Sequence, residues 1–129
     1  MAIEQYGGND QSYVAGADLS TKQYYVVEEA TTGLITVCDN AGDYPVGVLQ
    51  NKPKSGEAAQ VRQAGITKCV SDGSGTAIAI GDDVGTSATG KCIKKASDAD
   101  RTIGRAKSAS SADGVVISVD MSFMRQRAS

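Results

Sequence analysis

The sequence predicts an all-β protein, either a small β-barrel or a sandwich-like single domain, with an extended N-terminal arm. Three observations favour this class. The 129 residues include 15 glycines and only 2 prolines, short β-branched runs recur between turn-forming residues, and no window supports a long amphipathic helix. We therefore expect roughly eight to ten short strands. The predicted segments are an arm over 1–20, a β-rich domain over 21–122 and a C-terminal tail over 123–129.

The first segment, residues 1–20, is expected to be an arm that is loose in isolation. It contains the polar, glycine-rich run from Gly7 to Ser12 and shows no hydrophobic period of a helix or a strand. Such a stretch has too little apolar surface to offset the entropy of ordering it. Fully extended, it would reach about 66 Å, far enough to lie across a neighbouring subunit.

Strand candidates follow in order along the rest of the chain. Tyr24–Glu28 is rich in aromatic and β-branched residues, and Leu34–Cys38 follows after a turn, so the two segments predict a hairpin. In the next candidate, Gly47 indicates a bulge or a close backbone approach. A chain of this length allows a modest core but hardly a second one. The remaining candidates are 46–49, 58–64, 66–70, 77–80, 91–94, 102–106 and 115–121, and residues 106–113 could form about one helical turn.

Cysteines and paired acidic residues give no sign of a cofactor or metal site. Cys38, Cys69 and Cys92 are odd in number and lack the C-x-x-C spacing, which argues against a disulfide framework and a zinc site. We expect each to be a small buried apolar side chain. Asp82 and Asp83 are adjacent, and neighbouring strand residues point to opposite faces, so we interpret them as turn residues that bond local backbone amides. We expect no cofactor and no metal.

Composition also argues against several functional classes. The chain has no histidine, the most common general base, and no nucleophile motif, so we expect no enzymatic activity. A formal net charge of −2 provides no positive field for nucleic acid. No apolar stretch approaches the roughly 20 residues that a membrane span needs, and residues 1–10 lack the apolar block of a secretion signal. We expect a protein made in the cytosol.

Large side chains near the two ends are candidate contacts with a neighbouring protein. Tyr6 and Tyr13 are the large residues of the predicted arm, and Phe123, Arg125 and Arg127 lie in the predicted tail. Arginine and aromatic residues are favoured at interfaces. The alternative for the tail is a frayed basic end without a partner.

From Tyr24 to Val119 the order of motifs resembles the capsid decoration, or cement, proteins of tailed bacteriophages. The resemblance covers about three quarters of the chain and includes turns that would join successive hairpins. The motifs that carry it are YPVGVL at 44–49, PKSGE at 53–57, AQVR at 59–62, GI at 65–66, AIAIGD at 77–82, a glycine at 90, IGRA at 103–106 and ADG at 112–114.

This resemblance implies a β-barrel or β-tulip-type unit that binds the outside of an expanded phage shell and stabilises it. It implies a major capsid protein of the HK97-like fold as partner and a homo-oligomer, with a trimer favoured. It also implies a place on the outer capsid surface of the virion, after synthesis in the host cytoplasm. A ligand that binds only the assembled shell stabilises it by mass action, and an arm that crosses to a neighbour adds avidity.

Two other interpretations remain open. The chain could be another repetitive virion component, such as a tail accessory or a glycan-binding module, with Tyr24 and Tyr25 as the candidate glycan pair. At least one of them must face the core, because strand residues alternate between faces. A small hydrolase is the third interpretation and has the least support, because histidine and a nucleophile motif are missing.

Overall fold

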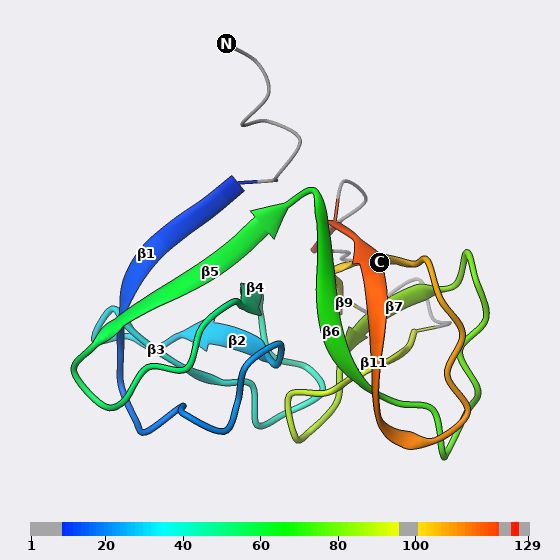
Figure 1. Ribbon diagram of the computed structural model, residues 1–129, viewed down its shortest axis with the longest axis horizontal. Coiled ribbons are helices and arrows are strands. Elements are labelled where there is room, and N and C mark those ends of the chain that lie inside the picture. Colours follow the sequence, from blue (N-terminus) through cyan, green and yellow to red (C-terminus); the bar gives the residue numbers. More distant parts are fainter. Residues whose placement is uncertain (1–8, 96–100, 122–124, 127–129) are drawn as a thin grey trace, which may run out of the picture.

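The computed structural model describes residues 9–95, 101–121 and 125–126, which form two five-stranded β-barrels lying side by side (Figure 1). The described part of the chain contains no α-helix, which confirms the all-β prediction. In Figure 1 the first barrel, coloured blue to green, is at the left, and the second, coloured green to orange, is at the right. β5 leads directly into β6 at the top of the view, where the barrels meet.

Five strands form the first barrel: β1 (Asn9–Ala15), β2 (Val26–Glu29), β3 (Leu34–Val37), β4 (Pro45–Leu49) and β5 (Ala58–Ala64). Their order around the barrel is β1-β3-β2-β4-β5, and pairing of β5 with β1 closes it. β1 and β3 are parallel, and the other neighbouring pairs are antiparallel. The hairpin predicted from the sequence is β2–β3.

Five further strands form the second barrel: β6 (Ile66–Asp72), β7 (Asp83–Thr86), β8 (Cys92–Lys94), β10 (Gly104–Ala106) and β11 (Asp113–Asp120). Their order is β6-β8-β7-β10-β11, and pairing of β11 with β6 closes the barrel. Here β6 and β8 are the parallel pair. A separate two-stranded sheet consists of β9 (Arg101–Thr102) and β12 (Arg125–Gln126).

Both barrels have the same connectivity and nearly the same register. In each, the first strand lies parallel to the third, and the second strand lies between the third and the fourth. Val27 pairs with Gly47 between β2 and β4, and Val84 pairs with Gly104 between β7 and β10. The same number of residues separates the two valines as separates the two glycines. The chain is therefore an internal repeat of one five-stranded barrel. This repeat could not be recognised from the sequence, because equivalent positions often carry unrelated side chains.

Gly47 and Gly104 occupy equivalent positions for the same steric reason. A Cβ atom on Gly47 would collide with the carbonyl oxygen of Arg62 on β5, and one on Gly104 would collide with the carbonyl oxygen of Asp120 on β11. Only glycine allows the strands to approach so closely. The close backbone approach predicted for Gly47 is thus confirmed.

Two apolar clusters fill the molecule, which corrects the expectation that the chain could hardly bury a second core. The first cluster lies within the first barrel and includes Val27 and Leu49. The second combines side chains of the second barrel with Val26, Cys38 and Val48 of the first. Since adjacent strand residues point to opposite faces, β2 and β4 are covered on both sides. The second core therefore includes the contact between the barrels.

The arm expected over residues 1–20 differs from the structure in its second half. Residues 9–15 form β1, which pairs with β5 and is part of the first barrel. Tyr13 packs against the first core and Ala15 is buried. Pairing with a distant strand stabilises this segment although most of its side chains are polar, so side-chain periodicity did not reveal it. Residues 1–8 lie outside the described residues.

Three smaller expectations also need correction. Residues 77–80 form an isolated bridge between Ile78 and Ser110 instead of a strand, because Ile78 alone of this run packs into the core. Residues 106–113 contain no helical turn; they connect β10 to β11. Part of the predicted C-terminal tail is the short strand β12, which pairs with β9.

Candidate interaction surface

Tyr24 joins the two barrels through its backbone. Its N–H donates to the carbonyl oxygen of Leu49 in the first barrel at 2.7 Å, and its own carbonyl oxygen accepts the N–H of Val70 in the second at 2.9 Å. Tyr24 has a φ of +69°, a left-handed conformation that costs a bulky residue about 1–3 kcal/mol. Because the two hydrogen bonds hold it there, Tyr24 helps to fix one barrel relative to the other.

The turn between β7 and β8 forms a second link. The N–H of Val26 on β2 donates to the carbonyl oxygen of Gly90 at 2.8 Å. Gly90 has a φ of +77°, and a Cβ atom there would collide with the side chain of Val37. The turn therefore fits against the first barrel only with glycine at this position. Gln50 adds a side-chain bond, its Nε2 donating to Oγ1 of Thr67 at 2.8 Å.

The loop between β3 and β4 forms a third link. Arg101 of β9 places its guanidinium 3.5 Å from the centroid of the Tyr44 ring and donates to the carbonyl oxygen of Gly42 at 3.0 Å. Nζ of Lys95 donates to the carbonyl oxygen of Ala41 at 3.2 Å. These cation–π and charge-assisted contacts bind the loop to the second half of the chain. Together, the three links connect the two barrels into one unit.

An open cleft lies between the barrels. It has a volume of about 420 Å³, and its lining includes Tyr24 and Arg62 from the first barrel and Ile66 and Lys68 from the second. Nε of Arg62 lies 2.8 Å from a carboxylate oxygen of Asp10, and Nζ of Lys68 lies 5.9 Å from the centroid of the Tyr24 ring. The lining combines an aromatic ring with two cationic side chains. Ligand pockets for small molecules are mostly apolar and enclosed, so this cleft is better suited to polar groups of a macromolecule.

Tyr24 and Tyr25, the candidate glycan pair, do not form one aromatic platform. Tyr24 lines the cleft and packs against the second core. Tyr25 instead contacts Lys22, whose Nζ lies 4.8 Å from the ring centroid. The expectation that at least one of the two faces the core is confirmed by Tyr24.

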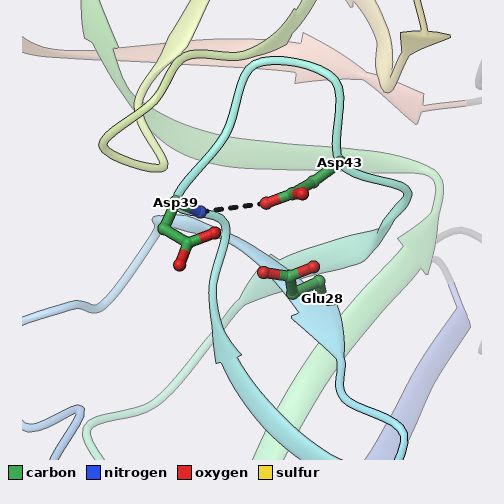
Figure 2. Close-up of side chains that lie close together, drawn as sticks. All are labelled: Glu28, Asp39 and Asp43. Atoms are coloured by element: carbon green, nitrogen blue, oxygen red, sulfur yellow. Dashed lines mark hydrogen bonds between the residues drawn. The ribbon is translucent and has the colours of Figure 1, made fainter.

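Glu28, Asp39 and Asp43 form an acidic cluster at the end of β2 and in the loop after β3 (Figure 2). Their carboxylate oxygens lie within 4.8 Å of one another. Asp43 accepts the backbone N–H groups of Asp39 and Asn40, both at 3.0 Å. Burial, followed by the hydrogen bond and the charge of Asp43, raises the pKa of Glu28 to about 7. Within the described residues this group has the ligand type that Ca²⁺ prefers, but a proton on Glu28 near neutral pH already relieves its repulsion.

Asp82 and Asp83, the acidic pair noted in the sequence, do not converge on one point. Asp82 accepts the backbone N–H of Ala79 at 2.8 Å. Asp83 lies 3.4 Å from Nε of Arg105. Asp82 thus stabilises a local turn, as predicted, and also lies 3.6 Å from Nζ of Lys94. Asp83 is instead the first residue of strand β7, so the turn role predicted for it is wrong.

All three cysteines are buried and unpaired by disulfides, as the sequence predicts. Burial raises the pKa of Cys38 to about 12. A hydrogen bond with Cys92, together with burial, raises the pKa of Cys69 well above its usual value. The thiolate is the form that acts as a nucleophile or binds a metal, and a raised pKa keeps Cys38 and Cys69 in the thiol form. With all three side chains buried, we interpret the cysteines as packing groups.

Large exposed apolar side chains of the described surface come from both barrels. Ile80 is 72% exposed, and Val116 is 50% exposed. Val115 and Val116 are neighbours on β11 that point to opposite faces, so the start of β11 is uncovered on both sides. Contiguous apolar patches on a surface mark contacts with other proteins, whereas single exposed apolar residues are common on any protein surface. The full set is Val14, Tyr44, Ile66, Ile80, Val115 and Val116.

The contact residues predicted from the sequence fall in different places. Tyr13 is half-buried in β1, and its hydroxyl accepts a hydrogen bond from Nε2 of Gln63 at 2.9 Å, so it is part of the first barrel. Arg125 is the first residue of β12. Outside the described residues lie Tyr6, Phe123 and Arg127.

The cleft, the three links and the acidic cluster could not be predicted from the sequence. Pairing between distant strands brings their residues together, and no local spacing marks them. One usable signal was the doubled apolar positions at Val26–Val27 and Val48–Leu49, which are typical of strands covered on both faces. In the described residues, no helix is long and apolar enough to cross a membrane.

Comparison with known proteins gives a family and similar solved structures. A search of curated proteins finds no match. The head fiber gp8.5 N base of bacteriophage phi29 is similar in structure, with a TM-score of 0.58 and 17% sequence identity, over 94% of this chain and 98% of that chain. At this identity the likeness shows the fold alone. Residues 6–121, which include both barrels, match the family described as phage cement protein. The chain therefore belongs to the phage cement protein family.

Proposed function

We propose that this protein binds the outer surface of an assembled phage capsid and stabilises it as a decoration protein. The observation that carries the proposal is the family match over residues 6–121, which spans the whole two-barrel unit. Membership of this family supports a structural role in the virion and not an enzymatic one. The proposed location is the outer capsid surface, after synthesis in the host cytoplasm.

The proposed partner is a major capsid protein of the HK97-like fold, and the proposed oligomer is a trimer. Both come from the resemblance to phage decoration proteins. The mechanism is thermodynamic: a protein that binds only the assembled shell lowers the free energy of that state by mass action. Because the three links hold the barrels together before binding, little conformational entropy is lost when the protein docks.

Exposed apolar residues are the proposed contact points, and Ile80 is the first to test because it is 72% exposed. A few apolar or aromatic anchors carry most of the binding free energy at protein interfaces. Residues near the two ends stay predicted contacts, with Tyr13 contributing only the part of its ring that the barrel leaves free. These end residues are Tyr6, Tyr13, Phe123, Arg125 and Arg127.

The test is co-sedimentation of the purified protein with undecorated, expanded capsids of the cognate phage. We expect saturation at a fixed multiple of the capsomer number and a higher melting temperature of the shell. Ile80→Asp should weaken binding at least about 10-fold, as expected for loss of an apolar anchor. Thr31→Asp, which adds the same charge to an exposed turn, is the control and should bind normally. Absence of wild-type binding at micromolar concentration would contradict the proposal.

A glycan-binding or tail accessory role is the alternative, and the Tyr24 ring in the open cleft is the observation that favours it. Exposed aromatic faces beside polar groups suit sugars. Binding of purified glycans by a protein that does not sediment with capsids would support this alternative.

A further inference from the structure

One edge of β1 is open. β1 pairs with β5 from Asn9 to Val14, but with β3 only at Val14 and Ala15. Among the described residues, the stretch 10–13 thus has a partner strand on one side only. In Figure 1 this half of β1 lies at the upper left, with β5 on one side.

Backbone directions show which groups face that edge. The N–H of Ala15 donates to the carbonyl oxygen of Glu57, on the β5 side, at 2.9 Å, and the N–H of Gly16 donates to a β3 carbonyl oxygen at 2.8 Å. Since backbone groups alternate along a strand, those of Asp10 and Ser12 face away from β5. They point to the side that β3 does not reach, and no described residue forms a hydrogen bond with them across this edge.

The second barrel has the same edge, and there the first barrel covers it. β6 pairs with β8 only at Ser71. The N–H of Val70 donates to the carbonyl oxygen of Tyr24 at 2.9 Å, and Nη1 of Arg62 donates to the carbonyl oxygen of Ile66 at 3.0 Å. The repeat thus places two equivalent edges in the molecule, one covered within the chain and one uncovered by the described residues.

We propose that the open edge of β1, residues 10–13, binds an extended strand from a second copy of this chain, formed by residues 1–8. Extended segments add to exposed sheet edges through backbone hydrogen bonds, and an uncovered edge readily pairs with another chain. Residues 1–8 directly precede β1 in the sequence and would span about 26 Å when extended, about twice the length of the edge. This interaction does not depend on capsid binding.

The direction of the backbone groups of Asn9 favours donation of residues 1–8 from another copy over docking of a chain's own residues 1–8. Folding back within one chain requires a reversal at Gly7–Gly8, and a tight two-residue hairpin there would make Asn9 a hydrogen-bonded partner. Asn9 is in phase with Ala15, so its backbone groups face β5. A second copy has no such constraint. Donation from each copy to the next is a heterologous contact, which forms a ring when the rotation between copies closes, and a ring of three would match the proposed trimer.

The experiment measures the mass of the full chain by sedimentation velocity between 1 and 100 μM, a range of about two decades around common affinities. Two variants each remove one side of the contact. Deletion of residues 2–8 removes the donor, and Ser12→Pro removes an N–H from the open edge without touching the β5 ladder, a position that tolerates proline. We expect an oligomer for the wild type and a monomer for each variant. Ser12→Ala keeps the N–H and should remain oligomeric.

Mixing the two variants is the decisive step. Ser12→Pro still carries the donor and the deletion variant still carries the edge, so together they should form a 1:1 complex. A wild-type monomer at 100 μM, or a mixture that stays monomeric, would overturn the proposal. Circular dichroism checks that both variants fold. If Ser12→Pro does not fold, hydrogen exchange of the Ser12 amide replaces this variant as the test. When the segment docks on the edge, we expect this amide to be protected in the wild type but not in the deletion variant. The mass measured by sedimentation then distinguishes docking between two copies from folding back within one copy.

Discussion

The two barrels carry opposite chemistry at equivalent positions. On the first barrel, Val26 of β2 pairs with Val48 of β4, and both are fully buried against the second barrel. On the second barrel, Asp83 of β7 pairs with Arg105 of β10 at the same places in the register. Their side chains are 42% and 47% exposed and form an ion pair. One backbone framework thus accepts either a buried apolar pair or an exposed charged pair, and the neighbour decides which.

This difference explains why the face of β7 and β10 needs no neighbouring barrel, whereas the face of β2 and β4 does. The outer face of β2 and β4 needs an apolar neighbour, and the second barrel supplies it. The equivalent face of β7 and β10 is charged, as the outer face of a terminal repeat must be to stay in water. A third barrel would have to desolvate the Asp83–Arg105 pair to dock there, which is costly.

The largest effect is expected where both barrels have the same steric requirement. Gly47→Ala and Gly104→Ala each force a strand away from a backbone carbonyl oxygen, and each should lower the free energy of unfolding by about 3 kcal/mol or more. Urea denaturation measures this change. Gly75→Ala, with no atom near its Cβ position, is the control and should change stability by about 0.5 kcal/mol at most. A similar small effect at Gly47 or Gly104 would contradict the close approach.

A second comparison concerns equivalent turns. Gly33 and Gly90 have φ values of +82° and +77°, but a Cβ on Gly33 would meet only Glu29 at 3.9 Å, whereas one on Gly90 would collide with Val37. Gly33→Ala should cost about 1–2 kcal/mol from backbone strain alone, and Gly90→Ala about 1–3 kcal/mol more from overpacking. Thermal unfolding of both variants measures the difference. Equal losses would show that the turn does not hold the barrels together.

The acidic cluster of the first barrel should make the stability of the protein depend on pH, and this effect should be smaller than those of the glycine substitutions. Because the folded-state pKa of Glu28 is raised from 4.5 to about 7, its contribution to stability is present below pH 4.5 and is lost as the pH rises through 7. Glu28→Gln should flatten this part of the stability profile between pH 4.5 and 8, measured as the urea midpoint. Glu29→Gln, an exposed neighbour, is the control and should follow the wild type. An unchanged slope in Glu28→Gln would refute this source of pH dependence.

The smallest expected effect is the reactivity of the cysteines in the folded protein. Cys38 lies on the first barrel's side of the shared core, and Cys69 and Cys92 lie in the second barrel. Burial should keep all three from reacting with a disulfide reagent until the protein unfolds. Mass spectrometry of partly labelled protein should then show either none or all three modified, because one core joins the barrels. Labelling of Cys69 and Cys92 before Cys38 would show that the barrels unfold separately.

Some features of the fold follow from the sequence alone because they are local. The strand expected at 58–64 is β5, and the alternating run at 66–70 lies within β6. Alternation of apolar and polar residues along one segment is enough to identify such strands. Burial of the cysteines and the turn role of Asp82 were also predictable from local chemistry.

Other features were decided only by the tertiary structure, because they depend on pairing between distant segments. β1 is a strand because β5 lies beside it, although residues 10–13 read as a polar arm. Glu28 and Asp43 meet because β2 lies between β3 and β4. The repeat itself is carried by backbone register, which side chains at Val26 and Asp83 do not share. Side-chain patterns report on one face of one strand, whereas register, covered faces and open edges are properties of strand pairs.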